Sequence, residues 1–202
     1  VIGSITLMPE NSKVKVLAIG MFDSVHFSGW LKHFQDEDIQ FLLFPSSPHR
    51  RLTAGLQQLL KNDGRGVFKL ATGTKYLGLP MWILDKALSN RFRSAFVKFL
   101  VSRLKPDFVH ALELQNAGYL ASRAFKGLTK KRPILVATNY GSDIYWFSRD
   151  PKHSKLISEL LAQVDRYAAE CGRDVELARR LGFIRDVMPV LPNAGGFTSS
   201  QL

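Results

Sequence analysis

The chain has 202 residues, of which 46% are apolar and 22% are charged, and its formal net charge at pH 7 is +11. This composition is typical of a globular domain with a sizeable core, and it excludes disordered and collagen-like chains. No apolar run approaches the roughly 20 residues of a bilayer-spanning helix. The chain has a single cysteine, Cys171, and residues 1–13 do not resemble a signal peptide, which favours a cytoplasmic protein.

The positive charge is concentrated in one part of the chain. Residues 49–105 contain 12 Lys and Arg but two acidic residues, whereas residues 133–202 contain eight of each. Such a block favours an anionic partner, and nucleic acid, lipid head groups and phosphate all fit it.

Short apolar segments rich in β-branched residues alternate with helical patterns along the chain, which predicts βα units around a parallel sheet. We expect strands at 14–20, 39–44, 67–70, 107–112, 133–138, 164–169 and 186–191. Pro45 ends the second strand because proline has no N–H for a central ladder. The predicted fold class is therefore α/β, a Rossmann-like parallel sheet with helices on both faces.

Helices are expected at 29–37, 86–104, 116–125, 150–163 and 172–181, the last ending at Gly182. The second is a basic amphipathic helix, whose apolar stripe is Leu88, Phe92, Ala95, Phe96, Phe99 and Leu100 and whose polar side includes Asn90, Arg93, Ser94, Lys98 and Ser102. Residues 45–66 and 71–85 are long connections rich in glycine and basic residues, which are often functional.

Several well-defined motifs are absent from the sequence. No Gly-rich dinucleotide fingerprint follows the first strand, and there is no P-loop, no H-E-x-x-H and no cysteine cluster. The five histidines show no short metal-ligand spacing, and the segment 141–143 has the wrong frame for a nucleophile elbow. We therefore expect no metal site and no bound cofactor.

Polar residues follow four predicted strands at their carboxyl ends, where open α/β sheets bind ligands. They are Asp23, His26, Ser28 and Gly29; His110, Glu113 and Asn116; Asn139, Tyr140, Gly141, Ser142 and Asp143; and Asn193 with its neighbours in 192–196. Their convergence predicts a site. Simpler interpretations are a buried His110, a turn with a helix cap at 139–143, and a hinge at 192–196.

Four segments together resemble the amino-terminal, acceptor-binding domain of a GT-B fold glycosyltransferase of family 4. They are residues 20–29, K-P-D-F-V-H at 105–110, T-N-Y-G-S-D at 138–143, and 173–195 with its L-G and L-P-N-A-G. The family commonly shows, in this order, P-D-hydrophobic-V-H, T-x-H-G-S-D, a helix ending in L-G, and hydrophobic-P-N-G. The resemblance spans about residues 13–196.

The resemblance implies a retaining, metal-independent hexosyltransferase of polysaccharide biosynthesis, which moves a sugar from a nucleotide-sugar donor to a glycan or lipid-linked acceptor. Its implied catalytic residues are His110, Glu113 and Asp143, and its implied substrate-binding residues are Asp23, His26, Ser28, Gly29, Asn139, Tyr140, Gly141, Ser142 and Asn193. Two positions depart from the family pattern: Leu112 replaces a second histidine of the strand, and Tyr140 replaces the loop histidine.

The resemblance also implies a domain organisation. Residues 1–12 would be an amino-terminal extension, 13–196 the Rossmann-like domain, and 197–202 the start of a linker to a donor-binding domain with an E-x7-E motif, so that this chain alone is expected to be inactive.

Two other interpretations stay open. One is a non-catalytic basic α/β module that binds nucleic acid or anionic lipid, and the other is a Rossmann-like enzyme complete in this chain. Nucleic acid is disfavoured because Phe92, Phe96 and Phe99 share one helix face and are expected in the core. The basic helix instead predicts peripheral attachment to an anionic inner membrane face.

Overall fold

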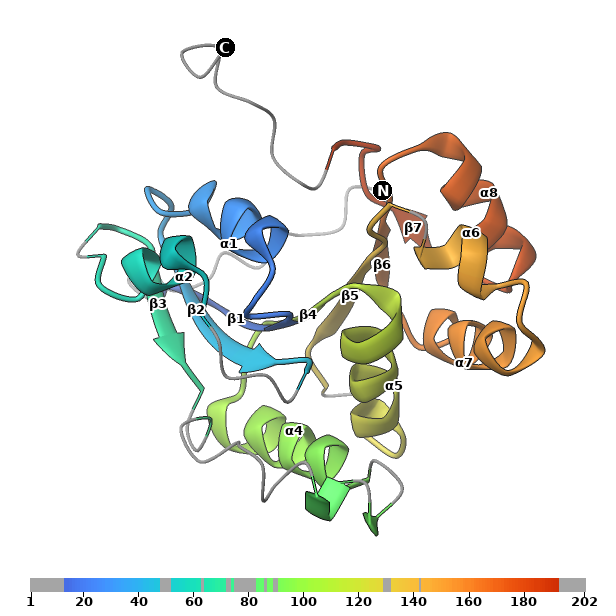
Figure 1. Cartoon of the computed structure of the whole chain (residues 1–202), viewed down its shortest axis with the longest axis horizontal. Helices are drawn as coiled ribbons and strands as arrows, with labels where there is room; N and C mark the ends of the chain where they lie inside the picture. The colour runs from blue at the N-terminus through green and yellow to red at the C-terminus, as the bar shows by residue number, and fades with distance from the viewer. Residues whose placement is uncertain are drawn as a thin grey trace, which may run out of the picture.

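A computed structural model describes residues 13–47, 52–62, 64–71, 74, 83–85, 87–88, 91–128, 132–141 and 143–192. Within these residues, one parallel sheet has the strand order β3-β2-β1-β4-β5-β6-β7 (Figure 1). The strands are β1 (Val14–Gly20), β2 (Ile39–Pro45), β3 (Val67–Leu70), β4 (Phe108–Leu112), β5 (Ile134–Thr138), β6 (Arg166–Ala168) and β7 (Asp186–Val187). The predicted Rossmann-like α/β fold class is confirmed.

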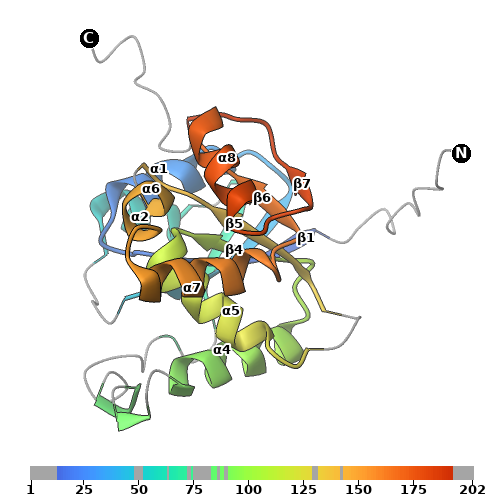
Figure 2. The same cartoon turned by 90° about the vertical axis from the view of Figure 1, so that its right-hand side faces the viewer.

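Helices cover both faces of this sheet. They are α1 (Val25–Lys32), α2 (Ala54–Leu59), α4 (Arg91–Leu104), the π-helical turn η2 (Leu114–Gly118), α5 (Tyr119–Phe125), α6 (Asp143–Phe147), α7 (Pro151–Leu161) and α8 (Gly172–Arg180). Helices α1 and α2 cover one face, and α4, α5 and α7 cover the other (Figure 1 and Figure 2). No helix in the described part of the chain is long and apolar enough to cross a bilayer.

The two faces produce two cores, because successive side chains of a strand point to opposite sides of the sheet. Leu17 and Ile19 of β1 belong to the core beneath α4, α5 and α7, whereas Val16 and Ala18 belong to the core beneath α1 and α2. The near-continuous apolar character of β1 is therefore explained by burial on both faces.

The chain order places a switch point between β1 and β4. Strand β1 pairs with β2 on one side and with β4 on the other. The chain runs outward from β1 through β2 to β3, and it then crosses back to form β4 on the other side of β1. In open α/β sheets, ligands bind at the carboxyl ends of the strands at such a point. Gly20 ends β1 here, and a Cβ on it would lie 2.5 Å from the ring of Phe27, so the close packing of α1 requires glycine.

Several helices and one strand begin or end at other residues than the sequence predicts, and for the helices the reason is a capping side chain that periodicity does not reveal. The helix predicted at 29–37 begins at Val25 and ends at Lys32, since the Ser24 side chain accepts a hydrogen bond from the His26 N–H. Helix α2, in a connection expected to lack one, is capped in the same way by Thr53. The last strand, expected to reach residue 191, ends at Val187.

Helix α4 buries a different face from the predicted one. Its buried residues are Ser94, Val97, Leu100 and Val101. Phe99, expected in the core, is 54% exposed, and Arg93, expected on the polar side, turns toward the sheet. The reason is that the Arg93 guanidinium donates to the backbone oxygens of Pro45 and Ser46, at the end of β2.

Candidate functional site

Glu113 directly follows β4 at the switch point and has an unusual backbone. Its φ is 102°, a region that favours glycine, and the π-helical turn η2 begins at the next residue. Backbone strain and π-helical turns both occur preferentially at functional sites. The Glu113 side chain is 5% exposed, so the fold holds a strained, buried carboxyl group at this edge of the sheet.

The Glu113 carboxylate is held by hydrogen bonds from two elements. The Ser46 Oγ, after β2, donates to Oε1 at 2.5 Å, and the Asn116 Nδ2, in η2, donates to Oε2 at 3.3 Å. Burial raises the pKa of Glu113, against the opposing effect of these hydrogen bonds, and the nearby Asp143 raises the pKa further. A carboxyl group whose pKa is shifted toward neutrality is suited to accept or donate a proton.

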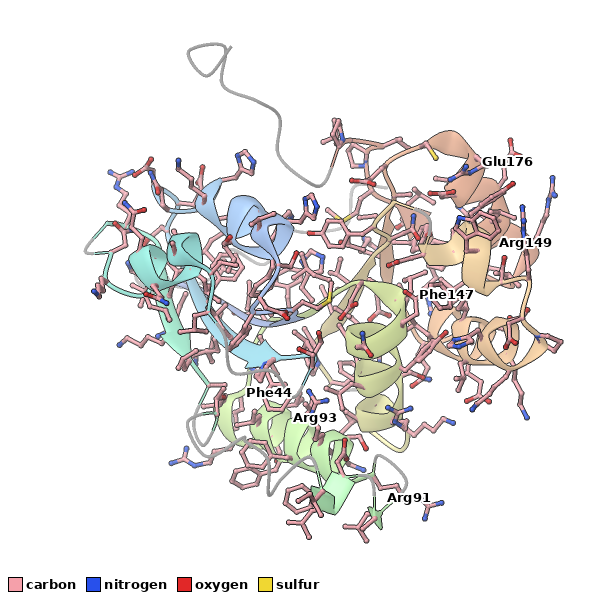
Figure 3. All side chains as sticks on the ribbon, in the orientation of Figure 1. Phe44, Arg91, Arg93, Phe147, Arg149 and Glu176 are labelled. Atoms are coloured by element: carbon pink, nitrogen blue, oxygen red, sulfur yellow. The ribbon has the colours of Figure 1, made fainter. Side chains whose placement is uncertain are left out.

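Ser46 is itself held in place by α4. The Arg93 guanidinium donates to the Ser46 backbone oxygen at 2.9 Å, and the Arg93 N–H donates to Oδ1 of the buried Asp85 at 3.0 Å. Figure 3 shows Arg93 beside Phe44 beneath the end of β2, while Arg91 points away from the sheet. Sequence reasoning missed Ser46 and Arg93. Ser46 follows a strand just as the predicted residues do, so the same signal applied to 45–66 would have found it.

Asp143 links the loops that follow β4 and β5. Its Oδ2 accepts the Leu114 N–H at 3.1 Å and the Tyr140 N–H at 3.4 Å. Burial raises the pKa of Asp143, and the two backbone hydrogen bonds oppose this shift. Asp143 therefore fixes the position of the π-helical turn relative to Tyr140.

Tyr140 places a hydroxyl group at the same edge. This hydroxyl is buried and has no hydrogen-bond partner among the described residues, and its ring centroid lies 6.5 Å from that of His26. Burial raises the pKa of Tyr140, so the group stays protonated and can donate. A buried hydroxyl without a partner costs free energy unless a ligand or water satisfies it, which makes Tyr140 a candidate ligand contact.

His110 lies deeper, on the α1 face of β4. Its Nε2 is 2.6 Å from the Thr138 Oγ1, and the Trp30 ring packs edge-on against it at a centroid distance of 4.7 Å. Burial lowers the pKa of His110 to about 3. The ring is therefore neutral near pH 7, and this geometry favours a role in positioning Trp30 and Thr138 over proton transfer.

The remaining predicted residues divide into three groups. Asp23 and His26 are exposed after β1, and exposed Gly141 donates its N–H to the Glu170 Oε2 at 2.7 Å, so these three lie at the surface of the site. Ser142 and Asn193 lie outside the described residues.

Asn139, Ser28 and Gly29 do not join the site. Asn139 is fully buried, donating to the Asp174 Oδ2 at 2.8 Å and accepting the Ile144 N–H at 3.0 Å, so its amide connects α6 and α8. Ser28 and Gly29 line a groove between α1 and α2. They follow β1 in sequence, but the pitch of α1 turns them toward α2.

The described part of the chain has no group of three or more His, Cys, Asp or Glu side chains placed to share a metal ion. The expectation that no metal or cofactor is needed stays a prediction.

Comparison with known proteins tests the resemblance to family 4 glycosyltransferases. Residues 83–170 match the family described as Glycosyl transferase 4-like. The resemblance to this family is confirmed. The matched segment contains β4, η2, α5 and β5, and it includes Glu113, Tyr140 and Asp143. Curated proteins give no match to the chain.

Two solved structures resemble this chain in fold. One is a UDP-N-acetylglucosamine 2-epimerase, with 13% identity and a TM-score of 0.54 over 85% of this chain and 46% of that one. The other is a putative UDP-N-acetylglucosamine 2-epimerase from Listeria monocytogenes, with 12% identity and a TM-score of 0.54 over 85% of this chain and 43% of that one. The chain thus spans less than half the length of either structure, and the likeness shows the fold alone.

Proposed function

We propose that this chain is the acceptor-binding half of a retaining hexosyltransferase, which transfers a sugar from a nucleotide-sugar donor to a glycan or lipid-linked acceptor in polysaccharide biosynthesis. The observation that carries the proposal is the strained, buried Glu113 at the switch point, inside the segment that matches the family. A parallel sheet, a switch point and convergent groups with shifted pKa values are the usual setting of an active site.

The proposed reaction assigns roles to two side chains. The acceptor oxygen forms a bond to the anomeric carbon, the bond from that carbon to the donor diphosphate breaks, and the acceptor proton passes to the Glu113 carboxylate. The Tyr140 hydroxyl donates a hydrogen bond to a sugar oxygen, which gives this group its partner. The donor binds mainly to a second domain, a view supported by the length of the solved structures, and closure between the domains excludes water.

We further propose that the domain binds an anionic membrane through a face defined by Ile83, Leu84, Leu88, Arg91, Lys98, Phe99 and Arg103, here called the α4 face. Its four apolar residues are 47–54% exposed. Asp85 is the only acidic residue at described positions of 83–105, and it is buried. Basic residues attract anionic lipids, while exposed apolar side chains insert at the interface. Ile83, Leu84 and Leu88 are aliphatic and offer no ring for base stacking, which favours lipid over nucleic acid, and Phe99 is the single aromatic ring of the α4 face.

The test is a transfer assay on the complete enzyme, with radiolabelled UDP-glucose, UDP-N-acetylglucosamine and GDP-mannose and an extract of cell lipids and glycans. Glu113→Gln should lower kcat/KM by about 100-fold, equivalent to about 2.7 kcal/mol of transition-state stabilisation. Tyr140→Phe should lower it by about 10-fold, because a hydrogen bond to the sugar is lost.

Tyr167→Phe is the matched control, since the Tyr167 hydroxyl is also buried without a partner among described residues but lies in the core of β6. It should retain full activity. Wild-type kcat/KM in a folded Glu113→Gln enzyme would contradict the proposed function of this site.

A further inference from the structure

A cluster of aromatic and basic side chains, of which Tyr145 is half-buried and the others are exposed, takes no part in the candidate site. It consists of Tyr145 and Trp146 of α6, Arg149 after α6, and Arg173 of α8, and is here called the aromatic ledge. Trp146 is 57% exposed. Exposed tryptophan is uncommon in soluble domains, and aromatic residues with arginine at a surface are typical of binding sites.

The aromatic ledge is a rigid surface. The Arg149 guanidinium lies 4.2 Å from the centre of the Tyr145 ring and 4.7 Å from that of Trp146, and Arg173 lies 4.4 Å from the Tyr145 ring. Trp146 packs edge-on against Tyr145, with ring centroids 5.7 Å apart. These contacts restrict both rings, so little conformational entropy remains to be lost when a ligand binds.

The ledge is connected directly to the candidate site. Helix α6 begins at Asp143, whose carboxylate accepts hydrogen bonds from Leu114 and Tyr140. Trp146 follows three residues later on the same short helix, so the ledge and Asp143 belong to one element. Phe147 does not belong to the ledge, because its ring packs against His153 at 4.9 Å, and Figure 3 shows it nearer the middle of the molecule than Arg149.

The charges around the ledge leave one guanidinium without a carboxylate. Asp174 bonds to Arg173, Glu170 accepts the Gly141 N–H, and Glu176, which lies on the same side as Arg149 in Figure 3, pairs with Arg180 at 3.8 Å. No salt bridge within the described residues includes Arg149, whose contacts are the two rings. Its fork of N–H donors matches a carboxylate or a phosphate.

We infer that the aromatic ledge is an acceptor subsite for an acidic saccharide. The apolar face of a sugar ring lies on the open side of Trp146, and the carboxylate or phosphate of that sugar binds Arg149. A sugar ring presents C–H groups on its face and hydroxyl groups on its rim, and the electron-rich face of an indole is complementary to the C–H groups. This inference rests on the proposed function, because it extends the acceptor site beyond Glu113 and Tyr140.

The test is calorimetric titration of the 202-residue chain with trigalacturonate and with its methyl ester, which keeps the sugar rings and replaces each carboxylate by an uncharged methyl ester. The acid should bind at least about 10-fold more tightly than the ester, since a tenfold ratio corresponds to one well-formed charged contact. Trp146→Ala should weaken binding of both saccharides about 10-fold or more. Arg149→Gln should weaken binding of the acid and leave the ester unchanged.

Two matched controls lie outside both the ledge and the α4 face. Phe147→Ala removes an aromatic ring of α6, and Arg180→Gln removes an exposed guanidinium of α8, and neither should change saccharide affinity. Unchanged binding in the Trp146 and Arg149 variants would overturn the ledge while leaving saccharide binding, and with it the proposed function, in place. Equal affinity for acid and ester, or no binding of either, would also overturn it, and the transfer assay with Glu113→Gln would then decide the proposed function separately.

The ledge has one competing occupant, a second copy of the chain. Sedimentation velocity should give a monomer for the wild type at the concentrations of the titration. A dimer that dissociates on Trp146→Ala would assign the ledge to self-association and overturn the saccharide subsite.

Discussion

At the scale of a single residue, Glu113 combines two features that are each costly for folding. Its backbone has a positive φ and its carboxyl group is buried, and hydrogen bonds from Ser46 and Asn116 offset part of this cost. Burial raises the pKa of Glu113 above its usual value of 4.5. The folded protein therefore binds this proton more tightly than the unfolded chain does, so ionisation of Glu113 costs stability.

Glu113→Gln should change the pH dependence of stability in a defined direction. Because the pKa of Glu113 is raised by folding, its contribution is fully present below pH 4.5 and is lost as the pH rises through the pKa of the folded state. Glutamine does not ionise. The unfolding free energy of the variant, measured with urea, should therefore rise relative to wild type between pH 4 and pH 8.

The matched control is Glu159→Gln on α7. A hydrogen bond from Lys126 lowers the pKa of Glu159, so that wild type gains stability from this group as the pH rises and the variant does not. The unfolding free energy of Glu159→Gln should therefore fall relative to wild type as the pH rises from 4 to 8. A flat or falling difference in unfolding free energy for Glu113→Gln would show that folding does not raise the pKa of this carboxyl group.

At the scale of an element, the two sides of α4 have different roles. The inward side carries Arg93, which holds the end of β2 and so the Ser46 hydroxyl at Glu113. The outward side carries the α4 face, where Arg91 and Lys98 flank Phe99. Because both sides belong to one 14-residue helix, a membrane bound to its outer side would lie a helix diameter of about 10 Å from the end of β2.

Co-sedimentation with vesicles tests the α4 face. Binding should rise with the fraction of anionic lipid and fall between low salt and 0.5 M salt, because screening shortens the Debye length. Arg91→Glu, Lys98→Glu, Arg103→Glu should abolish it, since each basic residue contributes about 1 kcal/mol near an anionic surface.

The control carries the same change of charge on the exposed basic residues Lys152, Lys155 and Arg180, and it should reduce binding much less. Phe99→Ser should weaken binding without changing its salt dependence. Equal recovery of wild type in the supernatant with neutral and anionic vesicles at low salt would exclude the membrane role.

At the scale of the whole molecule, the described residues form one seven-stranded Rossmann-like sheet with its helices. The chain spans less than half the length of the two solved structures compared above. The candidate site at the switch point faces outward at the carboxyl edge of this sheet, where a second domain of the proposed enzyme would complete it. Groups that bind the nucleotide tightly are therefore expected on that second domain.

Calorimetry on this chain with UDP-N-acetylglucosamine and GDP-mannose should show no binding tighter than about 1 mM, a free energy of about −4 kcal/mol. Titration with inorganic pyrophosphate at low and high salt controls for attraction of the donor phosphates by the basic residues. Sub-micromolar donor binding that survives high salt would show that the chain holds a complete donor site.

The sequence alone predicted the fold and part of the site, for one physical reason. Apolar segments of strand length separated by helical patterns specify a parallel sheet, and a parallel sheet brings all carboxyl ends to one edge without any knowledge of side-chain contacts. This argument predicted Glu113, Tyr140 and Asp143. In the structure, the Asp143 carboxylate accepts the N–H of Tyr140 and that of Leu114, which follows Glu113, and its charge raises the pKa of Glu113.

Tertiary structure alone decided which side chains enter the site. The hydrogen bond between Ser46 and Glu113 spans 67 positions, and the one from Arg93 to Ser46 spans 47, so both depend on β2 and β4 flanking β1. Periodicity places Arg93 on a polar stripe because it counts hydrophobicity, whereas the fold turns it inward to satisfy backbone oxygens at the end of β2. Local sequence patterns determine where helices and strands lie along the chain. Contacts between distant segments determine which groups each side chain contacts.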